Sequence, residues 1–256
     1  MKRSGYISDI RLSTRPDYIS KDILNLLKQY GVSIIELGLQ STDDNVLFLN
    51  GRGHTRKDIF DAVYNIREYP FKIGLQMMIG LFADNIKTIN RTVEDILLLK
   101  PDFVRIYPTI VIKDTHLETL YKKGVYKPYT LERAVSICKK LLLVFKKNDI
   151  PVIRLGLQAT DDINYGKALV AGPYHPAFRE IVETEIYRDL IEEEIKKYEI
   201  IGLKELIIYC HPRLSSKAAG FRKSNKNYFM KKYNFSRVKI IHLPDMKQDS
   251  IKVEIK

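Results

Sequence analysis

The chain has 256 residues, 45% of them hydrophobic, which is long enough for one sizeable α/β core with a small appended module. Its 43 Lys and Arg residues against 31 Asp and Glu residues give a formal charge of +12, which favours an anionic partner such as nucleic acid, a nucleotide or an acidic membrane surface. No apolar signal-peptide core opens the chain and no run reaches the ~20 apolar residues of a membrane span, so we expect a cytoplasmic protein.

Short apolar runs alternate with longer helical patterns, which is typical of a parallel α/β sheet or barrel. The expected strands are Ile7–Ser13, Ile34–Gln40, Lys72–Gly80, Phe103–Val111 and Val152–Gln158. The polar residues expected to cap the helices between them are Ser20, Thr55, Asn85 or Thr88, and Thr130. Gly31 is expected to end the first of these helices.

A Gly-Leu-Gln sequence recurs in "IELGLQSTDD", "IGLQMM" and "IRLGLQATDD". The spacing of the first two is about one βα unit, so we expect each to close a strand at one end of the sheet. Because ligands bind at the carboxyl ends of parallel strands, Gln40, Gln76 and Gln158 are candidates for a shared mouth. The alternative is that these amides satisfy loop backbone groups. Arg15, after another strand, has the same two readings: ligand contact or ion pair.

A second module is expected after an acidic helical stretch, in residues 201–256, with a strand, a helix from about Ser215 to Tyr233, and two further strands. Residues 213–239 contain several Lys and Arg residues and no Asp or Glu. Such basic groups can neutralise phosphates. The candidate nucleic-acid contacts are Arg213, Lys217, Arg222, Lys223, Lys226, Lys231 and Lys232. The interleaved aromatic residues could stack on bases or form the core of the module, and both readings remain open.

Five ordered motifs carry a family resemblance: "ISDIRLSTRPDYI", "IIELGLQSTDDNVLFLNGRGHT", "KIGLQMMIGL", "KPDFVRIYPTIVIKDTHLE" and "VAGPYHPAFRE". Together, over about residues 5–190, they resemble the radical S-adenosylmethionine (SAM) superfamily, and within it the elongator-like, tRNA-uridine-modifying branch. This resemblance implies a (β/α)6 barrel that binds SAM across its strand ends against a [4Fe–4S] cluster. In the family the cluster reduces the sulfonium and a 5′-deoxyadenosyl radical abstracts hydrogen from the substrate.

The resemblance also implies a set of cofactor-binding residues. Arg52 matches the arginine that grips the methionine carboxylate, a task suited to a planar fork of donors. Gln40 matches a polar residue at the methionyl end of SAM. Ser13 and Gln76 fall where relatives often carry acidic residues that contact the ribose hydroxyls. His54, His175 and Tyr107 could approach the same mouth or order loops and core.

The chain departs from the family in two places. The family holds its cluster with a C-x3-C-x2-C run, whereas this chain has only Cys138 and Cys210, so we expect no metal ligands here. The chain resembles the family from its third strand onward, as if two N-terminal βα units were missing. Second, Phe82-Ala83-Asp84-Asn85 stands where the family has a Pro-Gly-Asp-Thr turn, and phenylalanine does not fix φ as proline does.

We therefore expect an α/β fold: a truncated, partial (β/α)6 radical-SAM-type barrel in residues 1–200, followed by a basic βαββ module in residues 201–256. The resemblance implies SAM-dependent radical chemistry on RNA such as tRNA in the full-length family, and we expect this chain to be inactive alone. The alternatives are a non-enzymatic RNA- or nucleotide-binding remnant, and a split-enzyme subunit completed in trans by a chain that carries the cluster motif.

Overall fold

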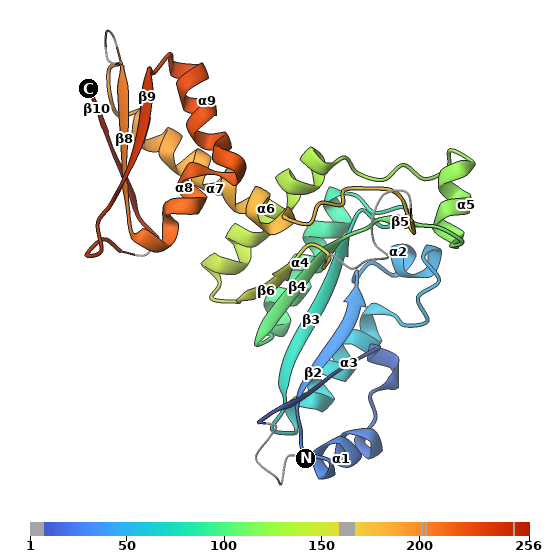
Figure 1. The fold of residues 1–256 in the computed structure, drawn as a ribbon. Helices are drawn as coiled ribbons and strands as arrows, with labels where there is room; N and C mark the ends of the chain where they lie inside the picture. The colour runs from blue at the N-terminus through green and yellow to red at the C-terminus, as the bar shows by residue number, and fades with distance from the viewer. Residues whose placement is uncertain (1–7, 159–166, 201, 203, 248) are drawn as a thin grey trace. The chain divides into compact units, whose positions relative to one another are not determined.

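A five-stranded parallel sheet organises the first of two units in the computed structural model, which describes residues 8–158, 167–200, 202, 204–247 and 249–256. The strands lie in the order β1 (Ile10–Thr14), β2 (Val32–Gln40), β3 (Lys72–Ile79), β4 (Phe103–Pro108) and β6 (Val152–Leu155) (Figure 1). Strand order in the sheet equals strand order in the chain. With right-handed crossovers, this order places every connecting helix on the same face, as in a barrel wall and unlike a doubly wound sheet.

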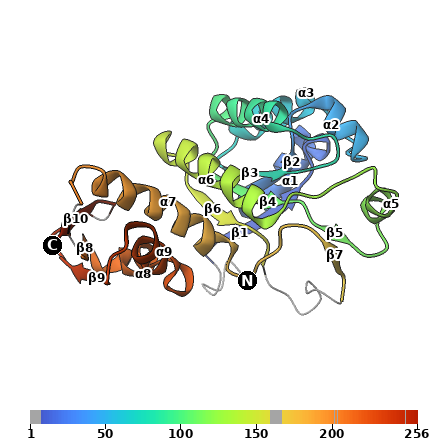
Figure 2. The ribbon, with the colours of Figure 1, turned by 90° about the horizontal axis from the view of Figure 1, so that it is seen from above.

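Most of the connecting helices begin at the polar caps that the sequence indicates, whereas the second begins at Asp43, which is not among the expected caps. The helices are α1 (Lys21–Gln29), α2 (Asp44–Leu49), α3 (Arg56–Arg67), α4 (Ile86–Leu99) and α6 (Leu131–Lys147) (Figure 2). The side chains of Ser20, Thr55 and Thr130 accept backbone N–H groups at the starts of α1, α3 and α6. Asn85 is the cap of α4, and Thr88 completes its capping box, which resolves the two alternatives for that helix.

The two faces of the sheet differ in chemistry because side chains alternate along each strand. In β2, Ile35, Leu37 and Leu39 are fully buried in the apolar core. The alternate positions of β2 carry Glu36, Gly38 and Gln40, so the opposite face is polar. This polar face is where the candidate site residues gather.

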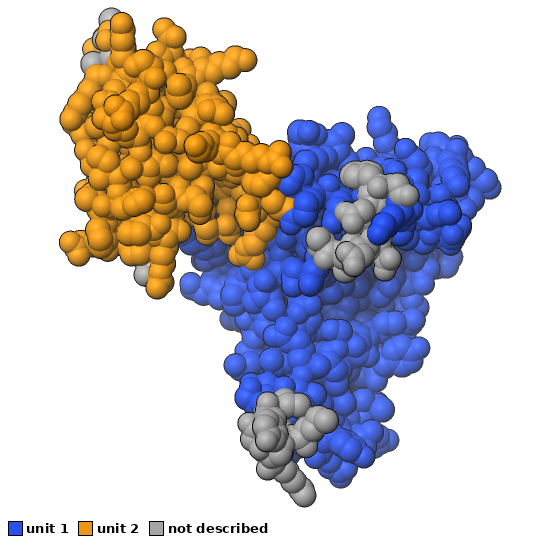
Figure 3. Space-filling view, viewed as in Figure 1, with its two compact units in different colours: residues 1–176 blue, residues 177–256 orange. Residues whose placement is uncertain are grey.

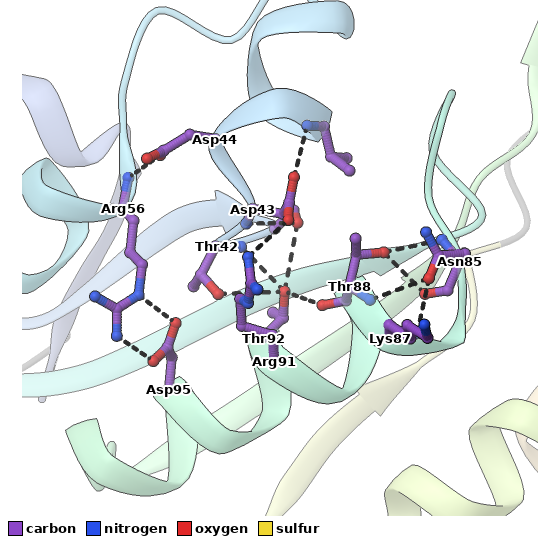
Figure 4. Close-up of polar contacts among 12 residues, drawn as sticks. Thr42, Asp43, Asp44, Arg56, Asn85, Lys87, Thr88, Arg91, Thr92 and Asp95 are labelled. Carbon is purple, nitrogen blue, oxygen red and sulfur yellow. Dashed lines mark hydrogen bonds and ion pairs between the residues drawn. The ribbon is translucent and has the colours of Figure 1, made fainter.

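Contacts between α4 and the loop after β2 hold that loop at the carboxyl end of the strands (Figure 4). The Thr42 N–H donates to Thr92 Oγ1 at 3.0 Å, and Thr92 Oγ1 also lies 3.4 Å from Ser41 Oγ. Asp43 caps α2 and pairs with Arg91 of α4. Arg56 pairs in bidentate fashion with Asp95, at 2.6 and 2.8 Å, so α3 and α4 are also joined.

The turn between β3 and α4 forms despite the substitution of the usual proline and glycine. The Asp84 N–H donates to the Leu81 carbonyl at 3.0 Å, and Ala83 has φ +64°, as the third residue of a type II turn requires. The Asp84 carboxylate accepts the Gly80 N–H at 2.9 Å. The Asn50 amide donates to the Phe82 carbonyl and accepts its N–H, at 2.9 and 3.1 Å. Side-chain hydrogen bonds thus hold the turn that proline would otherwise preset.

Replacing Ala83 with glycine is expected to stabilise the protein. An L-residue at positive φ is strained, and glycine removes that strain at a smaller entropic cost, so Ala83→Gly should raise the free energy of unfolding by about 0.5–1 kcal/mol. Ala134→Gly, within α6, should lower it by about 1 kcal/mol. Urea unfolding followed by circular dichroism checks both, and equal signs for the two variants would contradict the turn assignment.

Three of the expected strands have different bounds in the structure. The strand expected over residues 103–111 ends at Pro108, and Val111–Ile112 forms β5, which pairs antiparallel with β7 (Leu169–Ala171). The strand expected over 152–158 ends at Leu155. Ile7 lies outside the described residues, and β1 begins at Ile10. A 3-10 helix (η2, Pro16–Tyr18) and α5 (His116–Lys122) complete this unit. Within the described ranges, no helix is both long and apolar enough to cross a membrane.

The second unit, residues 177–256, is coloured orange in Figure 3, and it contains three strands together with α-helices and short 3-10 helices. Its elements are α7 (Phe178–Ile195), β8 (Glu205–Cys210), η3 (Pro212–Leu214), α8 (Ser215–Ala219), η4 (Phe221–Lys223), α9 (Ser224–Tyr233), β9 (Arg237–His242) and β10 (Ile251–Ile255). Strand β8 lies between β9, which is parallel to it, and β10, which is antiparallel.

The boundary lies before α7 rather than near residue 200. Ile191 and Ile195 of α7 are fully buried in one apolar cluster with Leu206, Ile208 and other residues of the small sheet, so this acidic helix has a core face. The helix expected over 215–233 is interrupted at Gly220, which has φ +79°. A Cβ at Gly220 would lie 2.7 Å from the Asn225 backbone nitrogen, so the break depends on glycine.

Candidate functional site

A polar pocket of about 280 Å³ opens on the polar face of the parallel sheet. It is lined by Ser13, Thr14, Arg15, Glu36, Gly38, Gln40, Arg52 and Gln76. All four cofactor-binding residues inferred from the sequence, Ser13, Gln40, Arg52 and Gln76, therefore lie around one cavity. They come from β1, β2, β3 and the loop after α2, and the parallel register brings them together.

One buried carboxylate forms the inner wall of the pocket. Glu36 is 2% exposed, and its Oε1 lies 3.2 Å from Arg11 Nη1 and 3.1 Å from Arg105 Nη2. Ser13 Oγ donates to Glu36 Oε2 at 3.3 Å. Glu36 and Arg105 are not among the residues that the sequence patterns indicate. The available signal was a charged residue two positions before Gly38, on the polar side of an otherwise apolar strand.

Gln40 reaches the pocket through an unusual backbone conformation. It has φ +62° and is 6% exposed, and its amide Oε1 accepts a hydrogen bond from Gln76 Nε2 at 3.4 Å. A Cβ at Gly38 would lie 2.8 Å from Gln40 Nε2, so glycine lets the amide take this position without being displaced. Of the three recurring glutamines, Gln40 closes its strand, whereas Gln76 lies three residues before the end of β3.

Arg52 is a cation of the pocket that lacks an ion-pair partner in the described chain. Its Nε is buried without a hydrogen-bond acceptor among the described residues. Burial, and secondarily the nearby charge of Arg15, lower the pKa of Arg52 from its ordinary value. Arg15 itself is engaged, because its guanidinium donates to Asp17 at 2.6 and 2.9 Å. An anion bound at Arg52 would offset both the cost of burying the guanidinium charge and its repulsion by Arg15.

The backbone around Arg52 is fixed by local hydrogen bonds. Its N–H donates to the Leu47 carbonyl at 2.9 Å, and Asn50 ties the same loop to the turn after β3. A Cβ at Gly53 would lie 2.3 Å from Arg15 Nη2, so glycine allows Arg15 to lie against the loop. These contacts fix the backbone that carries the Arg52 side chain.

His54 lies outside the pocket lining and contacts the backbone next to Gln40. Its Nε2 donates to the Leu39 carbonyl at 3.1 Å, directly before the left-handed Gln40, and its Nδ1 is a buried acceptor without a partner in the described chain. Burial is the main cause that lowers the pKa of His54, and the charges of Arg52 and Arg15 act in the same direction. The neutral ring therefore orders the Leu39–Gln40 peptide, and His54 lines no part of the pocket itself.

The lowered pKa of His54 predicts a pH dependence of stability. The unfolded chain takes up a proton near pH 6.5 and the folded chain only at lower pH, so the stabilisation is complete above 6.5 and is lost as the pH falls. His54→Gln keeps a donor for the Leu39 carbonyl but does not titrate. We expect the wild type to lose more stability than this variant between about pH 7 and 5, as measured by urea unfolding. Parallel curves for the two proteins would contradict this role.

The other candidates lie elsewhere. Gln158 follows β6 on the surface, where its Oε1 accepts from Arg154 Nη2 at 3.3 Å. Tyr107 is in β4, with its hydroxyl 3.5 Å from Arg105 Nη1, and His175 lies between β7 and α7. Cys138 and Cys210 are buried in α6 and β8, in different units, and burial raises the pKa of both thiols. Among the described residues, no three His, Cys, Asp or Glu side chains are placed to hold a metal ion.

The basic candidates of the second unit divide into two groups. Lys217 and Lys232 form ion pairs with Glu183 and Glu192 of α7. The others show no ion pair with a carboxylate of the described chain, and these are Arg213, Arg222, Lys223, Lys226 and Lys231. The interleaved aromatic residues mostly pack inward: Phe229 is 0% and Phe235 3% exposed.

Two family models match the chain. The model of the radical SAM superfamily matches residues 2–96, which include the whole pocket, and the model of the Radical_SAM C-terminal domain matches residues 101–188. The chain belongs to the radical SAM superfamily. The parallel sheet with helices on one face is thus a partial wall of a radical SAM barrel.

Relatives place the chain within the elongator-like branch of the radical SAM superfamily. It is 33% identical over 129 residues to the tRNA uridine(34) acetyltransferase of Methanocaldococcus infernus, covering 49% of this chain and 24% of the relative. It is 33% identical over 138 residues to the Elongator complex protein 3 of Homo sapiens, covering 52% and 25%. The solved archaeal Methanocaldococcus infernus Elp3 with an N-terminal deletion aligns with a TM-score of 0.62 and 27% identity, covering 71% of this chain and 42% of that structure. The chain therefore spans about a quarter of the length of these two curated relatives.

Proposed function

We propose that this chain binds S-adenosylmethionine in the polar pocket and contributes to the modification of tRNA. The single observation that carries the first part is Arg52, whose buried Nε lacks an acceptor beside an open cavity. A guanidinium fork matches the two oxygens of an amino-acid carboxylate. The methionyl end of SAM carries such a carboxylate.

The other pocket residues supply matching donors and acceptors. Gln40 and Gln76 present amides that can bind the amino group or hydroxyls of the ligand, and Ser13 presents a hydroxyl held by Glu36. His54 and Asn50 keep the backbone of this cradle in position. Bound SAM supplies a sulfonium centre, which is the source of radical chemistry in the superfamily. The role of this chain's own residues is to hold and orient it.

The residues present do not fit the iron–sulfur cluster. The only two cysteines lie in different units, and both are buried as protonated thiols. This mismatch favours, as a second candidate, a chain that binds SAM or RNA without radical activity of its own, or one that acts with a cluster-bearing partner chain.

The proposal of a tRNA substrate is supported by the names of the relatives and by charge. One relative is named a tRNA uridine(34) acetyltransferase, and the five basic residues of the second unit that pair with no described carboxylate can contact phosphates. Lys217 and Lys232 contribute less to this proposal because each is neutralised by a glutamate.

Isothermal titration of the full chain with SAM tests the cofactor assignment. We expect one site per chain, and the absence of binding at millimolar SAM would reject the proposal. Anaerobic reconstitution with iron and sulfide, followed by assay for 5′-deoxyadenosine, separates the two candidates, because SAM cleavage requires a cluster.

A further inference from the structure

A row of charged side chains crosses the polar face of the sheet beside the pocket. It consists of Arg11 on β1, Glu36 on β2, Arg105 on β4 and Arg154 on β6. Arg105 and Arg154 are direct register partners, so they emerge on the same face. Glu36 and Arg154 also occupy equivalent positions of the repeated sequences "IELGLQ" and "IRLGLQ". The repeat that marks the pocket thus also places an arginine at the far side of the sheet.

The positive charge of this row is only partly compensated. Glu36 Oε1 is shared between Arg11 and Arg105, at 3.2 and 3.1 Å. Arg154 has only the neutral amide of Gln158 as a hydrogen-bond partner, and no carboxylate of the described chain pairs with it. Like charges directly opposite each other on neighbouring strands are destabilising. The pair Arg105–Arg154 therefore carries a repulsion that Glu36 relieves from one side only.

The donors around this pair suit a tetrahedral anion. Arg105 is 23% exposed and its Nε is buried without an acceptor in the described chain. The Tyr107 hydroxyl lies 3.5 Å from Arg105 Nη1, two residues nearer the carboxyl end of β4, where ligands of parallel sheets bind. Two guanidinium forks and a hydroxyl present several N–H and O–H groups from neighbouring strands, and phosphate accepts such donors at several oxygens. Arg11 is not part of this set, because it also lies over the Phe103 ring at 5.3 Å.

We propose that Arg105 and Arg154 bind a phosphate group of an RNA substrate next to the SAM pocket. Neither arginine lines the pocket, and Arg105 is linked to it only through its ion pair with Glu36, so the two ligands have separate sites. The phosphate is assigned to RNA, and this assignment rests on the proposed function. A free nucleotide would present the same phosphate chemistry, and the experiment distinguishes the two sources.

Fluorescence anisotropy of a labelled single-stranded oligoribonucleotide with the full chain and its variants provides the test. Arg154→Gln should weaken RNA binding by about tenfold and lower the slope of log affinity against log salt by about 0.7. Arg154→Lys keeps the charge and should stay within about threefold of the wild type. Lys140→Gln removes an equal charge from an exposed position of α6 and should change the affinity much less. SAM titration and thermal unfolding of each variant show whether the pocket and the fold are intact.

Several outcomes would overturn the inference: equal RNA affinity of Arg154→Gln and Lys140→Gln, equal loss in Arg154→Lys and Arg154→Gln, or no RNA binding by the wild type. If instead uridine monophosphate binds the wild type in an Arg154-dependent way and RNA does not, the phosphate comes from a free nucleotide and the RNA assignment is wrong. If RNA binding depends on Arg154 but SAM does not bind, this inference stands and the proposed cofactor site fails.

Discussion

Arg52→Ala should reduce the affinity for SAM on the order of 100-fold, because it removes the only pocket cation whose charge is not already paired within the described chain. Arg52→Lys should lose about tenfold, since an ammonium supplies charge without the planar fork. Isothermal titration of the full chain measures both. Arg52→Ala is expected to have the largest effect on SAM binding, because the pocket offers the carboxylate of SAM no other cation that is unpaired within the described chain.

The ligand itself provides the sharpest control for Arg52. 5′-Methylthioadenosine keeps the adenosine and the sulfur but lacks the amino-acid carboxylate, so Arg52→Ala should leave its affinity unchanged. Arg91→Gln removes an arginine that pairs with Asp43 outside the pocket and should not affect SAM binding. Equal loss of both ligands in Arg52→Ala would show that Arg52 maintains the pocket instead of recognising the carboxylate. No loss of SAM binding would remove Arg52 from the site.

Phe229→Ala should lower the free energy of unfolding of the second unit by about 3–5 kcal/mol. The ring is 0% exposed and lies in the apolar cluster with Tyr233 and Phe235, at 6.4 Å from the Tyr233 ring. Removing it leaves a cavity among α9, α7 and the small sheet. Urea unfolding monitored by circular dichroism, with hydrogen exchange to assign the loss to residues 177–256, checks the value.

The same position decides between the two readings of the aromatic residues in the second unit. Phe229→Leu keeps most of the buried volume, so the unit should remain folded and RNA affinity should not change. Met230→Ala, at the neighbouring exposed position, should alter stability by less than about 0.5 kcal/mol. A loss of RNA binding in Phe229→Leu at full stability would instead identify the ring as a base-stacking contact.

The predictions for His54 and Ala83 both test the backbone segments that surround the pocket. His54 orders the Leu39–Gln40 peptide, and the Ala83 turn is tied through Asn50 to the loop that carries Arg52. Both elements combine a residue at positive φ with a side chain that compensates it. The pocket is therefore held rigid by strained backbone positions that neighbouring hydrogen bonds stabilise.

The sequence by itself determined the features that depend on neighbouring residues in the chain. Ser20, Thr55 and Thr130 cap their helices because each side chain binds an N–H group within three residues, which a linear pattern reveals. The alternating strands and helices fixed the parallel sheet, and the ordered motifs fixed the radical SAM superfamily. They also indicated Ser13, Gln40, Arg52 and Gln76, which the structure places around one pocket.

Only the tertiary structure decided the features that depend on register and packing between distant segments. Glu36 meets Arg105 because β2 and β4 flank β3 on a common face, and Arg154 opposes Arg105 because β6 shifts its register beside β4. The acidic pattern of α7 concealed a core face, since its buried residues are recognised only with the small sheet packed against them. Gly220 interrupts a helical pattern because it has φ +79° at a position where the Asn225 backbone leaves no room for a Cβ. These are interactions of folded surfaces, and single-chain periodicity carries no information about which surfaces meet.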